Sequence, residues 1–481
     1  MLKLLLIGCG PHARTFYFPA LRRWQAQGMA SIAAAVDLEC QQEMLEGFLA
    51  GTAVEPILVP PSDQRLAPVA QARIEDAVHR HGVSGVIIST DPLSHRVYAE
   101  WAIRRGLHVL LDKPVTARRD AALCEDEACG VEQDYLALRN AYERAWPQTR
   151  TAFVLCAHRR YHPGIAFARE IVAQTCAHTG CPVTNIHAWH ADGQWRLPAE
   201  MVTQSHHSYY DGHGKISHSG YHFLDCVARF WQAGEASGKR ADDVEVYASF
   251  VRPRGLLRQL THEDYRRLFG PDYDSACDSS DEELHERFAG YGEIDAEVQV
   301  TFRSAGEPVG LASVSLLHNS FSRRSWLRPG ADLYKGNGRV KHEQHRVQVG
   351  PFLEVQIHSY QAKDRHAVSG PEDAQVGGNN HFEVLLFRNT GMLGGGDPLE
   401  IVTLEGLAGD LSRERLFIEQ IKEGAIREFL AFMRGEVSRQ ELKSDISDHL
   451  PGIRLMSAAY LSHARRLGGG NPVVTAEWRA V

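Results

Sequence analysis

The stretch Leu2-Lys3-Leu4-Leu5-Leu6-Ile7-Gly8-Cys9-Gly10-Pro11-His12-Ala13 decides the fold of this 481-residue chain. Its first six residues are almost uniformly apolar, which predicts a central parallel strand buried on both faces. The next six form the pattern G-x-G-x-x-A, and residues 15–27 then have the spacing of an amphipathic helix. Strand, glycine turn and helix in this order predict a dinucleotide-binding unit, with the pyrophosphate at the helix N-terminus. The predicted phosphate-binding residues are Gly8, Cys9, Gly10, Pro11, His12 and Ala13.

An acid follows the next strand at the distance that a dinucleotide site requires. Residues 31–36 form this predicted strand, and Asp37 comes directly after it. A carboxylate there binds the ribose hydroxyls of the cofactor and repels a 2′-phosphate. The sequence therefore favours NAD(H) over NADP(H). A lone G-x-G-x-x-A is also compatible with a purely structural turn, but strand, helix and acid together favour the cofactor.

The first part of the chain continues as alternating strands and helices. A buried strand over residues 83–90 is followed by a helix over 94–105 and a strand over 109–111. Ligands bind beyond the carboxyl ends of such parallel strands. We therefore expect Ser89, Thr90 and His95 to contact the cofactor. Lys113, held by the following proline, is placed to reach the reacting end of a nicotinamide.

The pattern changes in the second part of the chain. Residues 293–303 alternate strictly between polar and apolar, which is typical of a strand with one wet face. Further strands are predicted over residues 311–317, 347–349, 354–358, 382–387 and 401–404, and long helices over 411–433 and 450–466. The fold class is therefore α/β: an N-terminal Rossmann domain with a doubly wound parallel sheet, and a C-terminal α+β domain with a large, mostly antiparallel open sheet.

We expect the domains to meet near residue 150. The first, over 1–150, includes a helical insertion at about 118–149, and the second, over 151–481, includes insertions at about 255–292 and 323–345. Formal net charge is −8, with 43% hydrophobic and 23% charged residues. Scattered basic residues and the lack of a long apolar run argue against nucleic-acid and membrane partners. Because no apolar run is long enough to span a bilayer and the N-terminal run is the expected first strand rather than a signal peptide, we expect a cytoplasmic protein. In that reducing compartment, nine cysteines without a C-x-x-C pair predict free thiols.

A second group of chemically active residues lies between positions 211 and 225. If the chain is helical there, His218 and His222 lie one turn apart and Asp225 follows one turn later. Imidazoles can give or take a proton at neutral pH, which hydride transfer to or from a carbonyl requires. Two other interpretations stay open. The histidines can belong to an ordinary helix, or they can bind zinc, with ligands drawn from His206, His207, His213, His218 and His222.

Six motifs in order resemble those of the Gfo/Idh/MocA oxidoreductases. Besides the glycine turn they are Thr90 to His95, Asp112-Lys113-Pro114, His158-Arg159-Arg160-Tyr161-His162-Pro163, Gly220-Tyr221-His222-Phe223-Leu224-Asp225 and Ser457-Ala458-Ala459-Tyr460-Leu461-Ser462. The resemblance implies a Rossmann domain, a second domain whose open sheet forms homodimers or homotetramers, and a substrate that binds between the two. It covers nearly the whole chain apart from the insertions.

The resemblance also implies roles for individual residues. Lys113 contacts the nicotinamide ribose and the substrate oxygen, and His222 is the general acid and base. His218 stands where the family has an aspartate. It could instead donate a hydrogen bond to the substrate, with Asp225 supplying part of the missing charge. Pocket walls are expected from Arg160, Tyr161 and Trp195, although Trp195 also suits the core.

The expected activity is NAD(H)-dependent hydride transfer to or from a polyhydroxylated ring: a sugar, a cyclitol, or a sugar linked in a glycoside or nucleoside. No metal is expected to take part. Two alternatives stay open. One is an imine or ene reductase on the same scaffold, which the histidine at position 218 favours. The other is a non-catalytic NAD(H)-binding regulator.

Overall fold

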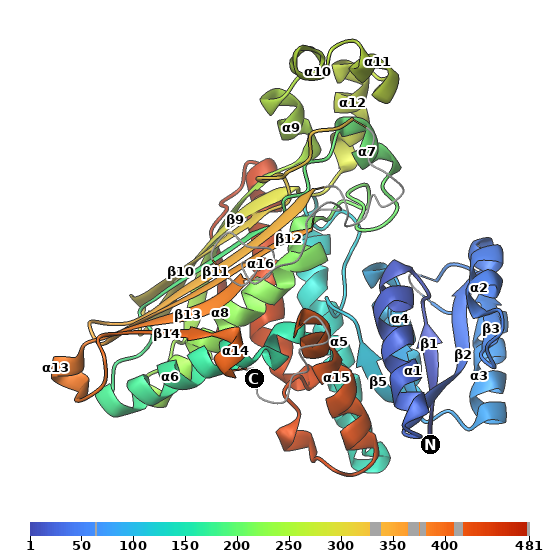
Figure 1. Ribbon diagram of the computed structural model, residues 1–481, viewed down its shortest axis with the longest axis horizontal. Coiled ribbons are helices and arrows are strands. Elements are labelled where there is room, and N and C mark those ends of the chain that lie inside the picture. The colour runs from blue at the N-terminus through green and yellow to red at the C-terminus, as the bar shows by residue number, and fades with distance from the viewer. Residues whose placement is uncertain (63–64, 328–337, 364–374, 376–380, 408–416, 479–481) are drawn as a thin grey trace. The chain divides into compact units, whose positions relative to one another are not determined.

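The computed structural model describes residues 1–62, 65–327, 338–363, 375, 381–407 and 417–478. The chain forms two compact units, each built on its own β-sheet. One unit holds residues 1–117, 133–162 and 410–450, and the other holds 118–132, 163–409 and 451–481. Figure 1 labels their helices and strands.

The first unit contains a six-stranded sheet in which all neighbouring strands are parallel. The order reverses between β1 and β4, and ligands bind beyond the carboxyl ends of the strands at such a switch point. The predicted doubly wound Rossmann sheet is thus confirmed. In spatial order its strands are β3 (Glu55–Val59), β2 (Ala30–Leu38), β1 (Leu2–Ile7), β4 (Gly85–Ile88), β5 (His108–Leu111) and β6 (Phe153–Leu155).

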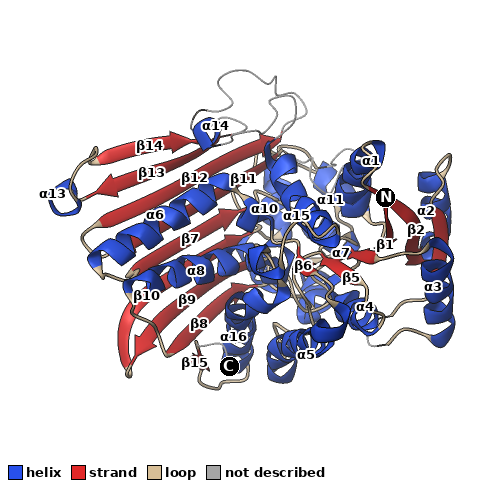
Figure 2. Ribbon diagram, turned by 90° about the horizontal axis from the view of Figure 1, so that it is seen from below, coloured by secondary structure: helices blue, strands red, loops and turns tan. Residues whose placement is uncertain are grey.

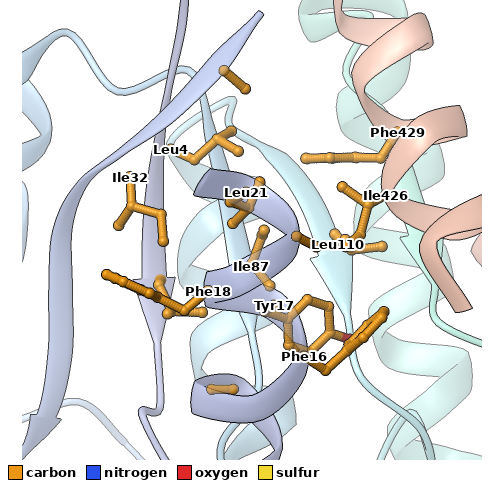
Figure 3. Packing of buried hydrophobic residues seen from close by; sticks show 14 of the residues in the cluster. Leu4, Phe16, Tyr17, Phe18, Leu21, Ile32, Ile87, Leu110, Ile426 and Phe429 are labelled. Atoms are coloured by element: carbon orange, nitrogen blue, oxygen red, sulfur yellow. The ribbon is translucent and has the colours of Figure 1, made fainter. Parts of the chain in front are cut away.

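The core of this unit joins segments from both ends of the chain. Leu4 and Leu110 of the strands lie in one buried cluster with Leu21 of α1 and with Ile426 and Phe429 of α15 (Figure 3). A single π-helical turn precedes α1, so the helix predicted over 15–27 starts as a wider coil. The helices are α1 (Phe18–Ala26), α2 (Gln42–Leu49), α3 (Pro68–His81), α4 (Pro92–Arg104), the later part of α5 (Glu125–Thr149) and α15 (Phe417–Met433).

The second unit contains a nine-stranded sheet. Among the described strand pairs of this sheet, only β7 and β10 run parallel. The predicted mostly antiparallel sheet is thus confirmed. In spatial order the strands are β14 (Leu399–Thr403), β13 (His381–Arg388), β12 (Leu353–Lys363), β11 (Arg339–Val349), β7 (Asn185–Ala191), β10 (Glu307–Leu317), β9 (Asp295–Ser304), β8 (Asp243–Val251) and β15 (Val474–Glu477).

Helices cover one face of this sheet. Helices α6 (Pro163–Thr179) and α8 (Tyr221–Gly234) pack against each other and lie along the strands, as Figure 2 shows. Helix α16 (Leu450–Leu467) lies near β8, because the Ser462 hydroxyl accepts a hydrogen bond from the Ala248 N–H at 2.7 Å. Residues of the other face alternate with the buried ones and are mostly polar and partly exposed, as in β9 and β12.

The insertion expected over 255–292 is a group of short helices with its own apolar cluster. Thr261 and Ser280 cap two of them through capping boxes. The helices are α9 (Pro253–Gln259), α10 (His262–Phe269), α11 (Asp272–Ala276) and α12 (Asp281–Arg287). Other short helices of this unit are α7 (Pro198–Thr203), α13 (Thr390–Leu393) and α14 (Leu404–Leu407).

One expectation, the insertion over 323–345, differs from the structure. Residues 339–345 belong to β11 rather than to an insertion over 323–345, of which 328–337 lie outside the described residues. The first six residues of the helix predicted over 411–433 also lie outside them. The first unit is built from separate segments of the chain, because β6 pairs with β5 and α15 packs on β5 and β6.

Candidate functional site

The glycine turn after β1 is shaped by close contacts. Gly8 has a φ of +88°, and a Cβ there would lie 2.6 Å from the Ser89 carbonyl oxygen. No L side chain fits that conformation and that space together. At Gly10, by contrast, a Cβ would meet no atom within 4 Å. The turn thus leaves open space above Gly10, where a pyrophosphate could approach the backbone.

The structure brings the predicted acid to this turn. The Asp37 carboxylate accepts hydrogen bonds from the Cys9 N–H at 3.0 Å and the Leu38 N–H at 2.8 Å. Burial raises its pKa, and these two N–H groups oppose that rise. An ionised carboxylate can accept about four hydrogen bonds, so both oxygens keep capacity for ribose hydroxyls.

His95 joins the loops that follow β4 and β5. Its side chain is buried, with Nδ1 lying 2.8 Å from the Pro114 carbonyl oxygen and Nε2 lying 3.2 Å from that of Thr90. Burial lowers its pKa, so the ring is neutral and donates to one carbonyl at a time. The contacts of His95 therefore fix the loop that contains Ser89 and Thr90.

Lys113 lies in the loop that follows β5, as the sequence predicts. Its N–H donates to the Asp112 carboxylate at 2.9 Å, and its peptide bond to Pro114 is cis. The second oxygen of Asp112 lies 3.6 Å from His12 Nε2 in the glycine turn. The glycine turn, Asp112 and Lys113 thus lie at the same end of the parallel sheet.

Arg160 and Tyr161 make structural contacts within the first unit. The Arg160 guanidinium donates to the carbonyl oxygens of Lys443 and Asp448, each at 3.1 Å. The Tyr161 hydroxyl donates to the Glu428 carboxylate at 2.5 Å. Both side chains therefore connect the turn after β6 to the segment around α15.

In the second unit, a π-helical turn over Ile216–Gly220 leads into α8. The predicted helix is present, but the wider turn rotates His218 relative to His222. His218, His222 and Asp225 are all buried. Asp225 packs on α16, because a Cβ at Gly452 would lie 3.2 Å from the Asp225 Cα.

Aromatic rings surround His218. The ring centroids of His207, His213, His318 and Tyr209 lie 4.8, 5.6, 5.8 and 5.6 Å from its own. Among the residues that the structure describes, no three His, Cys, Asp or Glu side chains are arranged to hold a metal ion. These rings pack around His218.

Asp192, which follows β7, forms the polar centre beside this cluster. Its carboxylate lies 2.5 Å from Lys215 Nζ, accepts from the Ser219 hydroxyl at 3.1 Å and also pairs with Arg339. Burial opposes ionisation, but the charges of Lys215 and Arg339 outweigh it and hold the pKa well below its usual range. Lys215 is fully buried, and burial lowers its pKa to about 8.

A second acid holds the π-helical turn from another direction. Glu293 accepts from the Ile216 N–H at 2.8 Å and from the Tyr460 hydroxyl at 3.0 Å. Burial raises its pKa to about 7. A Cβ at Gly214 would lie 1.9 Å from the Glu293 carbonyl oxygen, so only glycine allows this approach.

Sequence reasoning missed Asp192, Lys215, Glu293 and His318. They come from separate segments, and only the sheet and the π-helical turn bring them together. The one available signal was Lys215, a charged residue three positions before His218. Trp195 lies elsewhere, stacked on Tyr265 and Phe269 in the cluster of the helical insertion.

Lys113 belongs to the first unit, and His218, His222 and Asp225 belong to the second. Among the described helices, none combines the length and apolar character needed to cross a membrane.

Neither a family model nor a curated protein sequence matches this chain. Solved structures do match, over nearly its whole length. An inositol dehydrogenase homolog from Azotobacter vinelandii, complexed with NAD+, is 13% identical with a TM-score of 0.60, covering 99% of this chain and 97% of that one. An aldose-aldose oxidoreductase from Caulobacter crescentus, complexed with glycerol, is 14% identical with a TM-score of 0.54, covering 99% of both chains.

A third match is an oxidoreductase from Agrobacterium radiobacter in complex with NAD+, L-tartaric acid and magnesium. It is 14% identical with a TM-score of 0.56, covering 99% of this chain and 98% of that one. Likeness at this level of identity shows the fold. The chain has the two-domain fold of the Gfo/Idh/MocA oxidoreductases.

Proposed function

We propose that this protein is an NAD(H)-dependent oxidoreductase. Its substrate is a polyhydroxylated ring: a sugar, a cyclitol, or a sugar linked in a glycoside or nucleoside. The observation that carries the proposal is the contact between Asp37 and the Cys9 N–H, which joins the ribose-binding acid to the phosphate-binding turn. The neighbour complexed with NAD+ supports the cofactor, and the names of the two neighbours, an inositol dehydrogenase homolog and an aldose-aldose oxidoreductase, support the substrate class.

The residues of the first unit fit the cofactor. Gly10 leaves room for a pyrophosphate, and Asp37 keeps acceptor capacity for ribose hydroxyls while its negative charge disfavours a 2′-phosphate. NAD(H), when bound, supplies or takes up the hydride. His95 contacts the Thr90 and Pro114 carbonyls and so links the loop after β4 to the loop after β5, which bears Lys113.

The remaining chemistry belongs to Lys113 and His222. The Lys113 ammonium holds the reacting oxygen of the substrate and stabilises its developing negative charge by about 3–4 kcal/mol, as other preorganised donors do. His222 takes the hydroxyl proton during oxidation and returns it during reduction, directly or through Lys113. His218 hydrogen-bonds a neighbouring substrate hydroxyl as a neutral imidazole, and Asp225 supplies negative charge on the same helix.

A substrate panel tests this function. Purified protein is assayed with sugars, cyclitols and glycosides, and with imines and activated alkenes, while NADH absorbance is followed. Lys113→Ala and His222→Ala should each lower kcat at least a hundredfold, the usual contribution of a proton-transfer group. Exposed Lys239→Ala and His178→Ala are the matched controls and should change nothing.

The panel also separates the alternatives. Turnover of an imine or alkene alone would replace the proposal with a reductase. Tight NADH binding, measured by fluorescence, without turnover of any class would indicate a regulator. Full activity in both Lys113→Ala and His222→Ala would overturn the proposed mechanism.

We also propose that the protein acts as a homodimer or homotetramer in the cytoplasm. The uncovered face of the nine-stranded sheet carries exposed apolar residues between polar ones, including Leu311 and Phe387. A second copy of the chain would cover them. All nine cysteines are free thiols, which suits a reducing compartment.

A further inference from the structure

We propose that Lys215 is a positioning residue: its charge keeps His318 neutral with the proton on Nε2, so that the pair of His318 and Tyr209 beside His218 holds one hydrogen-bond direction. The role of this pair in catalysis rests on the proposed function. Its protonation state does not, and can be measured directly. The contacts around Asp192 carry the inference.

The hydrogen-bond geometry fixes the tautomer of His318. Its Nε2 lies 3.3 Å from the Asp192 carboxylate, which is ionised and only accepts. The proton of a neutral ring is therefore on Nε2, and Nδ1 has a lone pair. Tyr209 Oη lies 2.7 Å from Nδ1 and must donate its hydroxyl proton to it.

The charges around Asp192 keep the His318 ring neutral. The single negative charge of Asp192 is already met by two positive charges, those of Lys215 and Arg339. A third positive charge on His318 would meet no excess of negative charge. Burial lowers the pKa of His318 to about 4, and the nearby Lys215 ammonium lowers it in the same direction.

After burial, Lys215 is the charged group that lowers the pKa of His318 most. Asp295 accepts from the backbone N–H of His318 at 2.8 Å, and burial raises the pKa of this acid to about 6. The titratable and charged groups that face His318 or its partners are Tyr209, Asp192, Lys215, Arg196, Asp295, His190, His218, Arg339 and Glu293. Of the cations, Lys215 is fully buried and bonds both Asp192 and His190.

The protonation state of His318 affects His218, because the rings of His318 and Tyr209 lie beside it. His318 stacks near His218 at a centroid distance of 5.8 Å, and Tyr209 lies 5.6 Å away. A protonated His318 would carry a hydrogen on Nδ1 and could no longer accept from Tyr209. The Tyr209 hydroxyl would turn, and a positive charge would appear beside the imidazole proposed to bind the substrate.

The test is the titration of His318 in Lys215→Met, which removes the charge and keeps an aliphatic chain. Histidine side chains are labelled with nitrogen-15 and observed by NMR without cofactor or substrate, and His318→Gln assigns the signal. In the native protein His318 should stay neutral at pH 6, with its proton on Nε2. In Lys215→Met the titration midpoint should rise by at least one pH unit.

Ser219→Ala is the matched control, because it removes a hydrogen bond to the same carboxylate without changing any charge. It should leave the titration of His318 unchanged. If Lys215→Met does not fold, Lys215→Gln provides a neutral side chain that can still donate to Asp192. An unchanged titration of His318 in the folded variant would overturn the inference.

Activity provides the second readout. Since only the neutral ring supports the proposed arrangement, a titration midpoint that rises from about 4 to about 5 should lower kcat/KM of Lys215→Met about twofold at pH 5, and kcat/KM should approach the native value at pH 7. An equal loss at both pH values would mean a purely structural role. If the substrate panel finds no turnover, the proposed function fails while the NMR titration still decides this inference.

Discussion

The Asp37 carboxylate accepts a hydrogen bond from the Cys9 N–H across 3.0 Å, so the acid proposed to select the cofactor also holds the turn proposed to bind its phosphates. We predict that Asp37→Asn reduces the preference for NADH over NADPH at least tenfold. The amide oxygen can still accept from Cys9, but the charge that repels a 2′-phosphate is gone. Fluorescence titration with both nucleotides measures this, with exposed Asp76→Asn as the control. An unchanged preference would contradict the role of Asp37.

The two glycines of the turn should respond differently to alanine. Gly8→Ala places a Cβ 2.6 Å from the Ser89 carbonyl at a φ of +88°, so we expect a loss of about 1–3 kcal/mol in unfolding free energy. Gly10→Ala meets no atom within 4 Å and should leave thermal stability nearly unchanged while weakening NADH binding. Thermal melts and NADH titrations of both variants separate the effects. Equal loss of stability in both would refute this distinction.

Glu293 should make the stability of the protein depend on pH. Burial raises its pKa from 4.5 in the unfolded chain to about 7, so the folded protein binds a proton more tightly. This contribution is fully present below pH 4.5 and is lost as the pH rises through about 7, on the order of 3 kcal/mol at most. Glu293→Gln should remove that dependence. Denaturant melts at several pH values measure it, and parallel curves for both proteins would contradict it.

The uncovered face of the nine-stranded sheet should control assembly. Leu311 is 52% exposed and Phe387 is 39% exposed. Leu311→Asp together with Phe387→Asp should lower the mass observed by light scattering, because a charge buried between two copies lacks a partner. Leu268→Asp, at an equally exposed site in the helical insertion, should leave the mass unchanged. A native protein that is already monomeric would refute the proposed oligomer.

The sequence predicts the first unit well because its signals are local. Apolar strands, the glycine turn and Asp37 each depend on a few consecutive residues, and parallel strands bring their ends together by rule. The contact between His95 and the Pro114 carbonyl is harder to predict from the sequence. A histidine after a strand looks like a ligand contact, and only its burial reveals that it bonds the backbone.

The second unit is harder to predict, because its polar centre depends on long-range pairing. Asp192, His318 and Arg339 meet only after β7, β10 and β11 have taken adjacent places in the sheet. Strand β11 itself was missed over its first half, where residues 341–346 are charged, polar or histidine and show no clear alternation. Pairing with β12 and β7 holds these residues in a strand although their pattern does not predict one.

The core of the first unit has a consequence for how the protein is made. Ile426 and Phe429 complete a cluster that begins with Leu4, more than four hundred residues earlier. A ribosome must therefore release most of the chain before the first unit can close its interior. A fragment that stops at residue 162 would leave that apolar surface exposed to water and prone to aggregate. The smallest useful expression product of this unit needs α15 joined to it.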